Sequence, residues 1–501
     1  MFDYSKLKAH KNIKGKLITP FNYALGDELF SESWFRIRLP EFLWIALILK
    51  YYGRKEGLEK LATINHKLYE LVPLLRSPSL FLILQLTEEE QNKIYSMIGE
   101  IIDVKILSPL VSIYRYDQFP TFAHFFIDDF PDFNNNIKKI VEVLEATEFH
   151  QSDFTTDVRY IISHYHIISR QIRLARHIAK QIIDAFENFP ILDHSDEKMR
   201  SIRPRIRAME SGLFNMGEID HDKQKREEFI NFFWDNLSKT TDCELIKKNI
   251  QEETENPAGY IAGLQEIFRY LKDNFTIVKP LDQKMQVLLG IAIFAYKRIC
   301  EVYYHNLYHS ISGRGSVRCI IECYMILKYL VLIENDKPTV WADYQFYGIG
   351  KTKLIMAKYR EYSGKQDLSK SHVDADYLES LVHQYINEEL LDVNFKYFDD
   401  LNIKKKFEQI DEKELYDLYY DYDSHFEHGL WGAIRESALL KCASVTHQFH
   451  CVPDVFLEQT LPSVWHDCKF VMNKLILFLN TQYEIPSELL GLVIDDKPDS
   501  E

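Results

Sequence analysis

The chain has 501 residues, and its 60 Lys and Arg stand against 75 Asp and Glu, which gives a formal net charge of −15 at pH 7. A charge of this sign repels nucleic acid and anionic lipid at long range, so a protein that coats polyanions without specificity is excluded. With 46 % hydrophobic and 14 % aromatic residues the chain can bury packed cores, which excludes disorder for most of its length. Its 18 Gly and 16 Pro are few for this length, and because these residues usually form turns, we predict a helical protein.

The N-terminal half is predicted to be helical. Pro40 fits the first turn of a helix that starts the chain's first long apolar run, and Gly53 fits the C-terminal cap of the same helix. The segment 77–86 is an apolar run whose length suits either a strand or a buried helix, and we favour helix. Apolar residues recur at spacings of three and four, the period of an amphipathic helix, over residues 40–53, 89–107, 134–147 and 158–189.

A domain boundary is predicted at residues 252–260, where a polar, acidic run meets Pro257 and Gly259. Beyond it, residues 283–311 and 317–335 are predicted to form an antiparallel helix pair separated by a break at 312–316. We therefore predict an all-α fold of helical bundles. Its parts are an N-terminal helical domain over 1–255, a C-terminal helical domain over 256–490 and a disordered tail over 491–501.

Export and membrane insertion are not predicted. No apolar run of signal-peptide type follows the basic start of the chain. Of the two most apolar windows, 42–49 is too short to span a bilayer, and 319–333 is interrupted by Glu322 and Lys328. We therefore expect no membrane partner and a cytoplasmic location.

No metal or other cofactor is expected from the spacing of potential ligands. Seven cysteines occur without a CxxC pair, which argues against a disulfide framework and a zinc ribbon. His447 and His450, like His164 and His166, lack a recognised ligand spacing.

Charge is unevenly distributed along the chain. Residues 159–207 carry ten Lys and Arg against five Asp and Glu, and within them Arg170, Arg173, His177 and Lys180 recur at helical spacing as a candidate RNA-binding face. The alternative for these four residues is an ordinary solvated helix face. Residues 408–427 carry eight acids and one lysine, so this segment could attract a divalent ion, a basic segment or a partner.

The C-terminal half contains a constellation of polar side chains. Arg314, Arg318 and Glu322 follow one another at i,i+4, as do His305 and His309. Ser424, His428 and Trp431 share one predicted helix face, with His425 adjacent. Polar groups on inner helix faces must satisfy one another, which predicts an Arg–Glu–His–Ser cluster that is either catalytic or a structural network.

Several of these residues form a pattern that resembles a known protein family. The pattern Arg318-x3-Glu322, followed by Tyr422-x-Ser424-His425-x2-His428-Gly429, resembles a family called domain of unknown function 5677 over roughly residues 260–480. That family resembles the HEPN superfamily of helical bundles. Many HEPN proteins are metal-independent RNases or toxin components of prokaryotic conflict and antiphage systems, and their RNases use an Arg-x4–6-His motif. Five residues before His428 stands Asp423 rather than arginine, so the local motif is broken.

The resemblance implies a bacterial, HEPN-like effector or accessory protein of a defence or toxin-type system, with metal-independent RNA cleavage as its activity. His428 or His425 would then be the general acid or base, and Arg318 would stabilise the phosphorane while Glu322 and Ser424 orient the reacting groups. Two alternatives remain open. One is a non-enzymatic interaction module, and the other is a metal-dependent hydrolase that uses Asp417, Asp421 and Asp423. The expected partners are RNA, another protein or a second copy of the chain.

Overall fold

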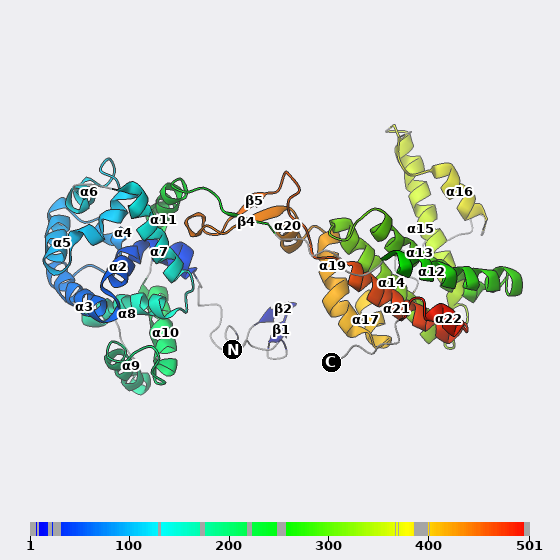
Figure 1. The fold of residues 1–501 in the computed structure, drawn as a ribbon, viewed down its shortest axis with the longest axis horizontal. Helices are drawn as coiled ribbons and strands as arrows, with labels where there is room; N and C mark the ends of the chain where they lie inside the picture. The colour runs from blue at the N-terminus through cyan, green and yellow to red at the C-terminus, as the bar shows by residue number, and fades with distance from the viewer. Residues whose placement is uncertain are drawn as a thin grey trace. The chain divides into compact units, whose positions relative to one another are not determined.

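The computed structural model describes residues 7, 10–18, 23, 32–128, 132–170, 176–217, 223–247, 257–365, 367–368, 370–384, 399 and 401–494. It is 69 % helix and 4 % strand, which confirms the all-α prediction. Two compact units are formed (Figure 1). Unit 1 comprises residues 1–245 and 441–450, and unit 2 comprises residues 246–440 and 451–501.

Unit 1 is a set of helices around one apolar core, together with a two-stranded antiparallel sheet. Its strands are β1 (Lys11–Ile13) and β2 (Lys16–Ile18). Its α-helices are α2 (Leu39–Tyr52), α3 (Arg54–Leu71), α4 (Leu80–Ile83), α5 (Glu88–Ile101), α6 (Pro120–Phe126), α7 (Phe133–Thr147), α8 (Asp153–Ile168), α9 (Arg176–Asn188), α10 (Met199–Gly217) and α11 (Lys223–Ser238). Shorter helical turns are η3 (Trp34–Arg38), η4 (Val104–Ile106), η5 (Ser108–Ser112) and η9 (Val445–His447).

Helix α2 is the centre of unit 1. Every residue from Leu39 to Leu49 is buried, and the helix packs against α3, α7 and α8. Pro40 lies in its first turn, and Gly53 ends it with φ +73°, a value that glycine adopts without strain. The helix predicted at 40–53 is therefore confirmed.

Of two other predictions in this unit, one is confirmed and one is wrong. Helix α4 confirms helix as the correct choice within 77–86. The continuous helix predicted over 158–189 is wrong, because α8 ends at Ile168 and Arg170 adopts a left-handed φ of +56° before α9 begins at Arg176. An apolar period can continue across such a turn, so periodicity alone did not reveal the interruption.

Unit 2 is built on helices that pack around α14. Its longer helices are α12 (Pro257–Asp273), α13 (Gln283–Tyr304), α14 (Ile311–Ile333), α15 (Val340–Ser363), α16 (Ala375–His383) and α21 (Trp465–Gln482). The shorter ones are η6 (Asn274–Val278), α17 (Ile403–Gln409), α18 (Lys413–Leu415), η8 (Tyr416–Tyr420), α19 (Asp421–Glu427), α20 (Trp431–Ser437) and α22 (Ser487–Leu490). Three further strands are β3 (Leu245–Ile246), β4 (Leu439–Cys442) and β5 (Cys451–Pro453). They form a three-stranded sheet of order β3–β4–β5. Leu245 and residues 441–442 belong to unit 1, and the other strand residues belong to unit 2.

The predicted helix pair is present as α13 and α14, which pack against each other. The break predicted at 312–316 is wrong, because α14 already begins at Ile311, capped by the Ser310 hydroxyl. Its glycines serve close packing rather than a turn. A Cβ on Gly313 would lie 2.3 Å from the Leu307 carbonyl oxygen, and one on Gly315 would lie 2.0 Å from a carboxylate oxygen of Glu427.

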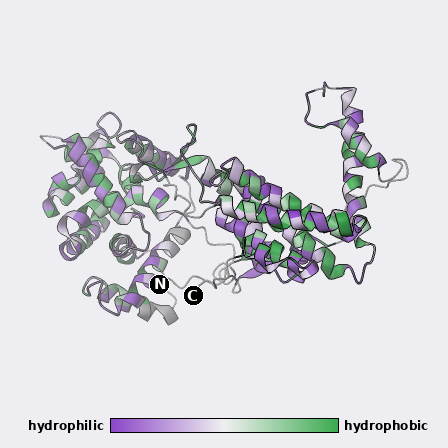
Figure 2. Ribbon diagram, turned by 45° about the vertical axis from the view of Figure 1, so that its right-hand side comes forward, coloured by the Kyte–Doolittle hydropathy of each residue, from purple (hydrophilic) through white to green (hydrophobic). Residues whose placement is uncertain are grey.

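Both units show the amphipathic character expected of packed helices. In Figure 2, hydrophobic and hydrophilic residues alternate along most helices. The core of unit 2 reaches to Val493, which is 3 % exposed, whereas residues 495–501 of the predicted tail lie outside the described residues. No helix within the described ranges combines the length and the apolar character needed to cross a membrane.

Candidate functional site

The predicted polar constellation is partly assembled where α19 packs on α14. The Arg318 Nε donates a hydrogen bond to the Ser424 Oγ at 3.0 Å, and its Nη2 donates to the Tyr420 hydroxyl at 2.9 Å. Glu322, one turn further along α14, lies 3.9 Å from Arg318. The structure therefore brings Arg318, Glu322 and Ser424 together, and it adds Tyr420, which the sequence analysis did not single out.

The two histidines predicted beside this network do not join it. His428 is the C-terminal cap of α19 and is exposed, and Gly429 follows with φ +59°. His425 is half-buried, and its carbonyl accepts a hydrogen bond from the Leu430 amide. Among the described residues, no hydrogen bond joins either imidazole to Arg318. His305 and His309 do not share a helix, since α13 ends at Tyr304. The His309 Nδ1 lies 2.9 Å from the Leu461 carbonyl oxygen.

Asp423 is the unusual acid of α19. It is 3 % exposed, and burial raises its pKa to about 7, although the charge of Arg314 opposes this shift. Arg314 is itself buried and donates to the Pro462 carbonyl at 2.9 Å. A carboxyl with this pKa can take up or release a proton near neutral pH. Asp423 stands five residues before His428 in the sequence, and only the fold shows that it is buried.

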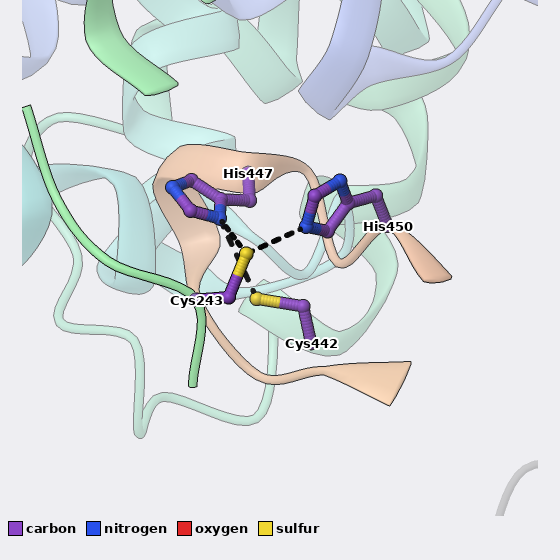
Figure 3. A group of neighbouring side chains, drawn as sticks. All are labelled: Cys243, Cys442, His447 and His450. Carbon is purple, nitrogen blue, oxygen red and sulfur yellow. Dashed lines mark hydrogen bonds between the residues drawn. The ribbon is translucent and has the colours of Figure 1, made fainter. Parts of the chain in front are cut away.

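A second cluster lies in unit 1 and was missed by the sequence analysis (Figure 3). In this cluster Cys243, Cys442, His447 and His450 each offer one potential ligand atom, and these four atoms all lie within 4.8 Å of one another. The expectation that no ligand set is completed is therefore corrected for these four residues. Three of them fall within residues 442–450, a local signal, but Cys243 lies 204 residues before His447 and could not be assigned from spacing.

The predicted RNA-binding face is only partly described. Arg170 is exposed and lies just beyond the end of α8. Arg173 and the side chains of His177 and Lys180 lie outside the described residues. The RNA-binding role of these four residues stays a prediction.

The aspartates considered for a metal-dependent hydrolase are not assembled as ligands. Asp417 pairs with Lys413, and Asp423 faces Arg314 in the interior. In the described part of the chain, the residues that could hold a metal ion together are Cys243, Cys442, His447 and His450 of unit 1.

Comparison with known proteins gives one match. Residues 288–442 match the model of a family of unknown function, DUF5677. This region resembles that family. The match runs from within α13, through α14 and the helices that follow it up to α20, to the end of β4. It contains Arg318, Glu322 and Ser424, so the resemblance inferred from those residues is confirmed. No curated protein and no solved structure gives a significant match to the chain.

Proposed function

We propose that unit 2, which contains most of the DUF5677-like region, is a non-enzymatic protein-interaction module whose helical bundle is held together by the Arg318 network. The observation that carries this proposal is the exposure of large apolar side chains on α20 and on the turn after β5, two segments that hydrogen bonds join. Trp431 is 69 % exposed, Phe456 83 % and Leu457 86 %. Exposed apolar patches of this kind mark interaction sites in soluble proteins.

The turn that carries Phe456 and Leu457 is fixed in its shape. The Asp454 carboxylate accepts hydrogen bonds from the amides of Glu458, at 2.9 Å, and Gln459, at 2.6 Å. The turn is also joined to the end of α20, because the Asp454 amide donates to the Ala438 carbonyl at 3.0 Å. A preordered turn loses little conformational freedom on binding, which favours recognition.

The charge of residues 408–427, which precede α20 in the sequence, indicates the chemistry of the partner. Residues 408–427 carry eight acids and one lysine. Lys413 pairs with Asp417, Glu412 pairs with Lys328 and Lys474, and Asp423 is buried. The remaining acids, all of them exposed, are Glu408, Asp411, Glu414, Asp421 and Glu427. The complementary partner is a protein with an apolar groove edged by Lys and Arg. The same negative charge repels RNA from the helix that carries His425 and His428.

The state of Arg318 agrees with a structural role. Its guanidinium joins α14 to η8 and α19 through Tyr420 and Ser424, and it lies over the Tyr420 ring at 4.9 Å. A cation that stabilises a phosphorane must instead turn its donors toward substrate.

Metal-independent RNA cleavage in a defence or toxin-type system is the second proposal. It is favoured by the exposure of His428 and by the pKa of Asp423 near 7 in the same helix, because general acid–base catalysis at neutral pH needs such groups.

The two proposals are separated by photo-crosslinking in cells that naturally produce the protein. A benzophenone side chain at Leu457 is expected to give one discrete protein adduct. Trp431→Asp should reduce this adduct about tenfold, because aromatic anchors dominate interfaces. The matched control is Leu281→Asp, which alters another fully solvated apolar side chain of unit 2 (95 % exposed) and should leave the adduct unchanged.

The adduct should also weaken as salt rises, since a basic-edged partner is attracted by charge. If the adduct instead joins two copies of the chain, the partner is a second copy of this protein and not a different protein. RNA cleavage by the purified protein that His428→Ala abolishes without a change in melting temperature would overturn the interaction module in favour of the second proposal.

A further inference from the structure

The cysteine–histidine group of unit 1 has the dimensions of a tetrahedral metal site. The Cys243 Sγ lies 3.2 Å from the His447 Nδ1 and 3.2 Å from the His450 Nε2, and the Cys442 Sγ lies 3.6 Å from the His447 Nδ1 (Figure 3). With Zn–S near 2.3 Å and Zn–N near 2.0 Å, the edges of a tetrahedron measure roughly 3.3–3.8 Å. These three separations are therefore close to the edges expected around one ion, and all four ligand atoms lie within 4.8 Å of one another.

The surroundings of His447 fix which of its nitrogens is the ligand. Its Nε2 lies 3.0 Å from the carbonyl oxygen of Ser238 and 3.0 Å from that of Thr241. Carbonyl oxygens only accept hydrogen bonds, so Nε2 carries the proton and Nδ1 presents its lone pair to the two sulfurs. Metal-binding histidines typically show this arrangement, in which the second nitrogen donates to a backbone carbonyl.

Four potential ligand atoms converge here, with the Cys243 sulfur between two imidazoles. In neutral groups the Cys243 thiol can donate to the His447 Nδ1 while its sulfur accepts from the His450 Nε2. The lone pair of the His447 Nδ1 faces two sulfurs. A single cation would satisfy all four ligand atoms at once, with both cysteines as thiolates.

The backbone brings three segments to the site. The Cys442 amide donates to the His450 carbonyl at 2.9 Å, so the ends of the ligand loop 442–450 lie side by side. The Ala443 amide donates to the Glu244 carbonyl at 2.7 Å, which places Cys243 beside that loop. Between the two histidines, Gln448 and Phe449 have φ values of +53° and +52°. Two consecutive non-glycine residues in this region are strained, and such strain persists where surrounding contacts enforce it, often at ligand sites.

We infer that Cys243, Cys442, His447 and His450 bind a structural Zn²⁺ that fastens residues 441–450 to unit 1. Two thiolates and two imidazoles in a tetrahedral set select zinc, and four protein ligands leave no position for substrate, so the ion is structural rather than catalytic. Cys243 lies at the end of the N-terminal part of unit 1, and the other ligands lie in the segment that returns from unit 2.

The returning segment also contributes to the core of unit 1. Val445 is 4 % exposed in that core, and the Phe449 ring packs 5.8 Å from the Phe35 ring. The zinc would therefore hold in place ten residues that complete unit 1 although they come from far along the chain. The four ligand atoms come together only when residues 441–450 are folded onto unit 1. Loss of the ion should therefore loosen residues 441–450 first.

Metal analysis of the purified full-length chain tests this inference. About one zinc per chain is expected after dialysis, and replacement by Co²⁺ should give the visible bands of a tetrahedral ion and the absorption of a thiolate–cobalt bond. Cys243→Ser and His450→Gln should each remove the tightly held metal. The control Cys451→Ser alters the residue next to His450, which lies outside the group, and should keep it.

A chelator should lower the melting temperature of the parent and of Cys451→Ser, and it should expose residues 441–450 to a protease. Parent protein that holds no metal and gives no cobalt spectrum would overturn the inference even if the variants fail to fold. So would a mass lower by about 2 Da that reveals a Cys243–Cys442 disulfide. Since all four ligands lie in unit 1, these outcomes do not depend on the interaction proposed for unit 2.

Discussion

Each unit contains an arginine–carboxylate network, and the two differ in burial. In unit 1 the Glu210 carboxylate is 2 % exposed and accepts from Arg38 at 2.6 Å and from Arg159 at 2.8 Å. In unit 2 the side chains of Arg318 and Glu322 are 25 % and 28 % exposed and lie 3.9 Å apart. The pair that the sequence marks by its i,i+4 spacing is therefore the looser one, because that spacing indicates proximity on a helix surface and not burial.

The first prediction concerns Glu210 and has the largest expected effect. Glu210→Ala would leave Arg38 and Arg159 buried without their carboxylate, so unfolding free energy should fall by about 3–5 kcal/mol. Denaturant unfolding of the full-length chain measures the change, and Glu322→Ala, the half-buried counterpart in unit 2, should cost at most about 1 kcal/mol. Equal losses in the two variants would show that burial does not distinguish the networks.

The same carboxylate should make unit 1 sensitive to acid. Burial acts to raise the pKa of Glu210, but the charges and hydrogen bonds of Arg38 and Arg159 outweigh it, so the folded-state pKa lies below the ordinary 4.5. Its contribution to stability is therefore complete above pH 4.5 and is lost as the pH falls toward the folded-state pKa. Melting of the parent and of Glu210→Ala should converge in that acidic range.

Asp423 offers the opposite pH dependence in unit 2. Its folded-state pKa of about 7, above the ordinary 3.8, arises from burial, which Arg314 and Arg318 oppose and Asp467 and Glu427 reinforce. The folded protein therefore holds a proton that the unfolded chain releases, and stability should fall as the pH rises from about 4 to 7. Asp423→Asn should make stability less dependent on pH over this window, with a gain of about 1–2 kcal/mol at pH 8 relative to pH 5. Melting temperatures at the two pH values provide the measurement, and parallel losses in parent and variant would contradict the assignment.

Arg318→Ala should have a smaller effect, because its site is partly open to water. Loss of its bonds to Ser424 and Tyr420 should cost about 1 kcal/mol, and Ser424→Ala should remove part of the same energy. Thermal unfolding of both single variants and of the double variant measures their coupling. Strict additivity would mean that Arg318 and Ser424 do not act as one network.

Local signals were enough to predict the helices but not their partners. Pro40, Gly53 and the apolar period identify α2, and the long apolar runs identify α13 and α14. The glycines of 312–316 misled the prediction, because Gly313 and Gly315 allow close approach within α14 instead of ending a helix.

Contacts between residues far apart in the chain could not be predicted from the sequence, for a physical reason. Arg38 lies 172 residues from Glu210, and Cys243 lies 204 residues from His447. Only the folded chain brings such groups together, and no spacing rule for helices or metal ligands extends so far. The network of Arg318 was predictable because Arg318 and Glu322 share a helix and Ser424 belongs to the same family motif.

The last and smallest expected effect concerns the basic residues near α8 and α9. If the protein acts as an interaction module, reversing charge at Arg170 should change the free energy of unfolding by less than about 0.5 kcal/mol, since Arg170 is exposed and substitutions on exposed surfaces are usually neutral. The same small change is expected when Lys180 is reversed as well. RNA affinity should also stay unchanged, because the chain as a whole carries a charge of −15. Each phosphate contact with single-stranded RNA contributes about 0.7 to the slope of log affinity against log salt, so titrations at several salt concentrations would detect the loss of even two contacts. A slope reduced by about 1.4 in the Arg170→Glu, Lys180→Glu double variant would identify this face as an RNA-binding surface and would favour the RNA-cleaving alternative over the interaction module.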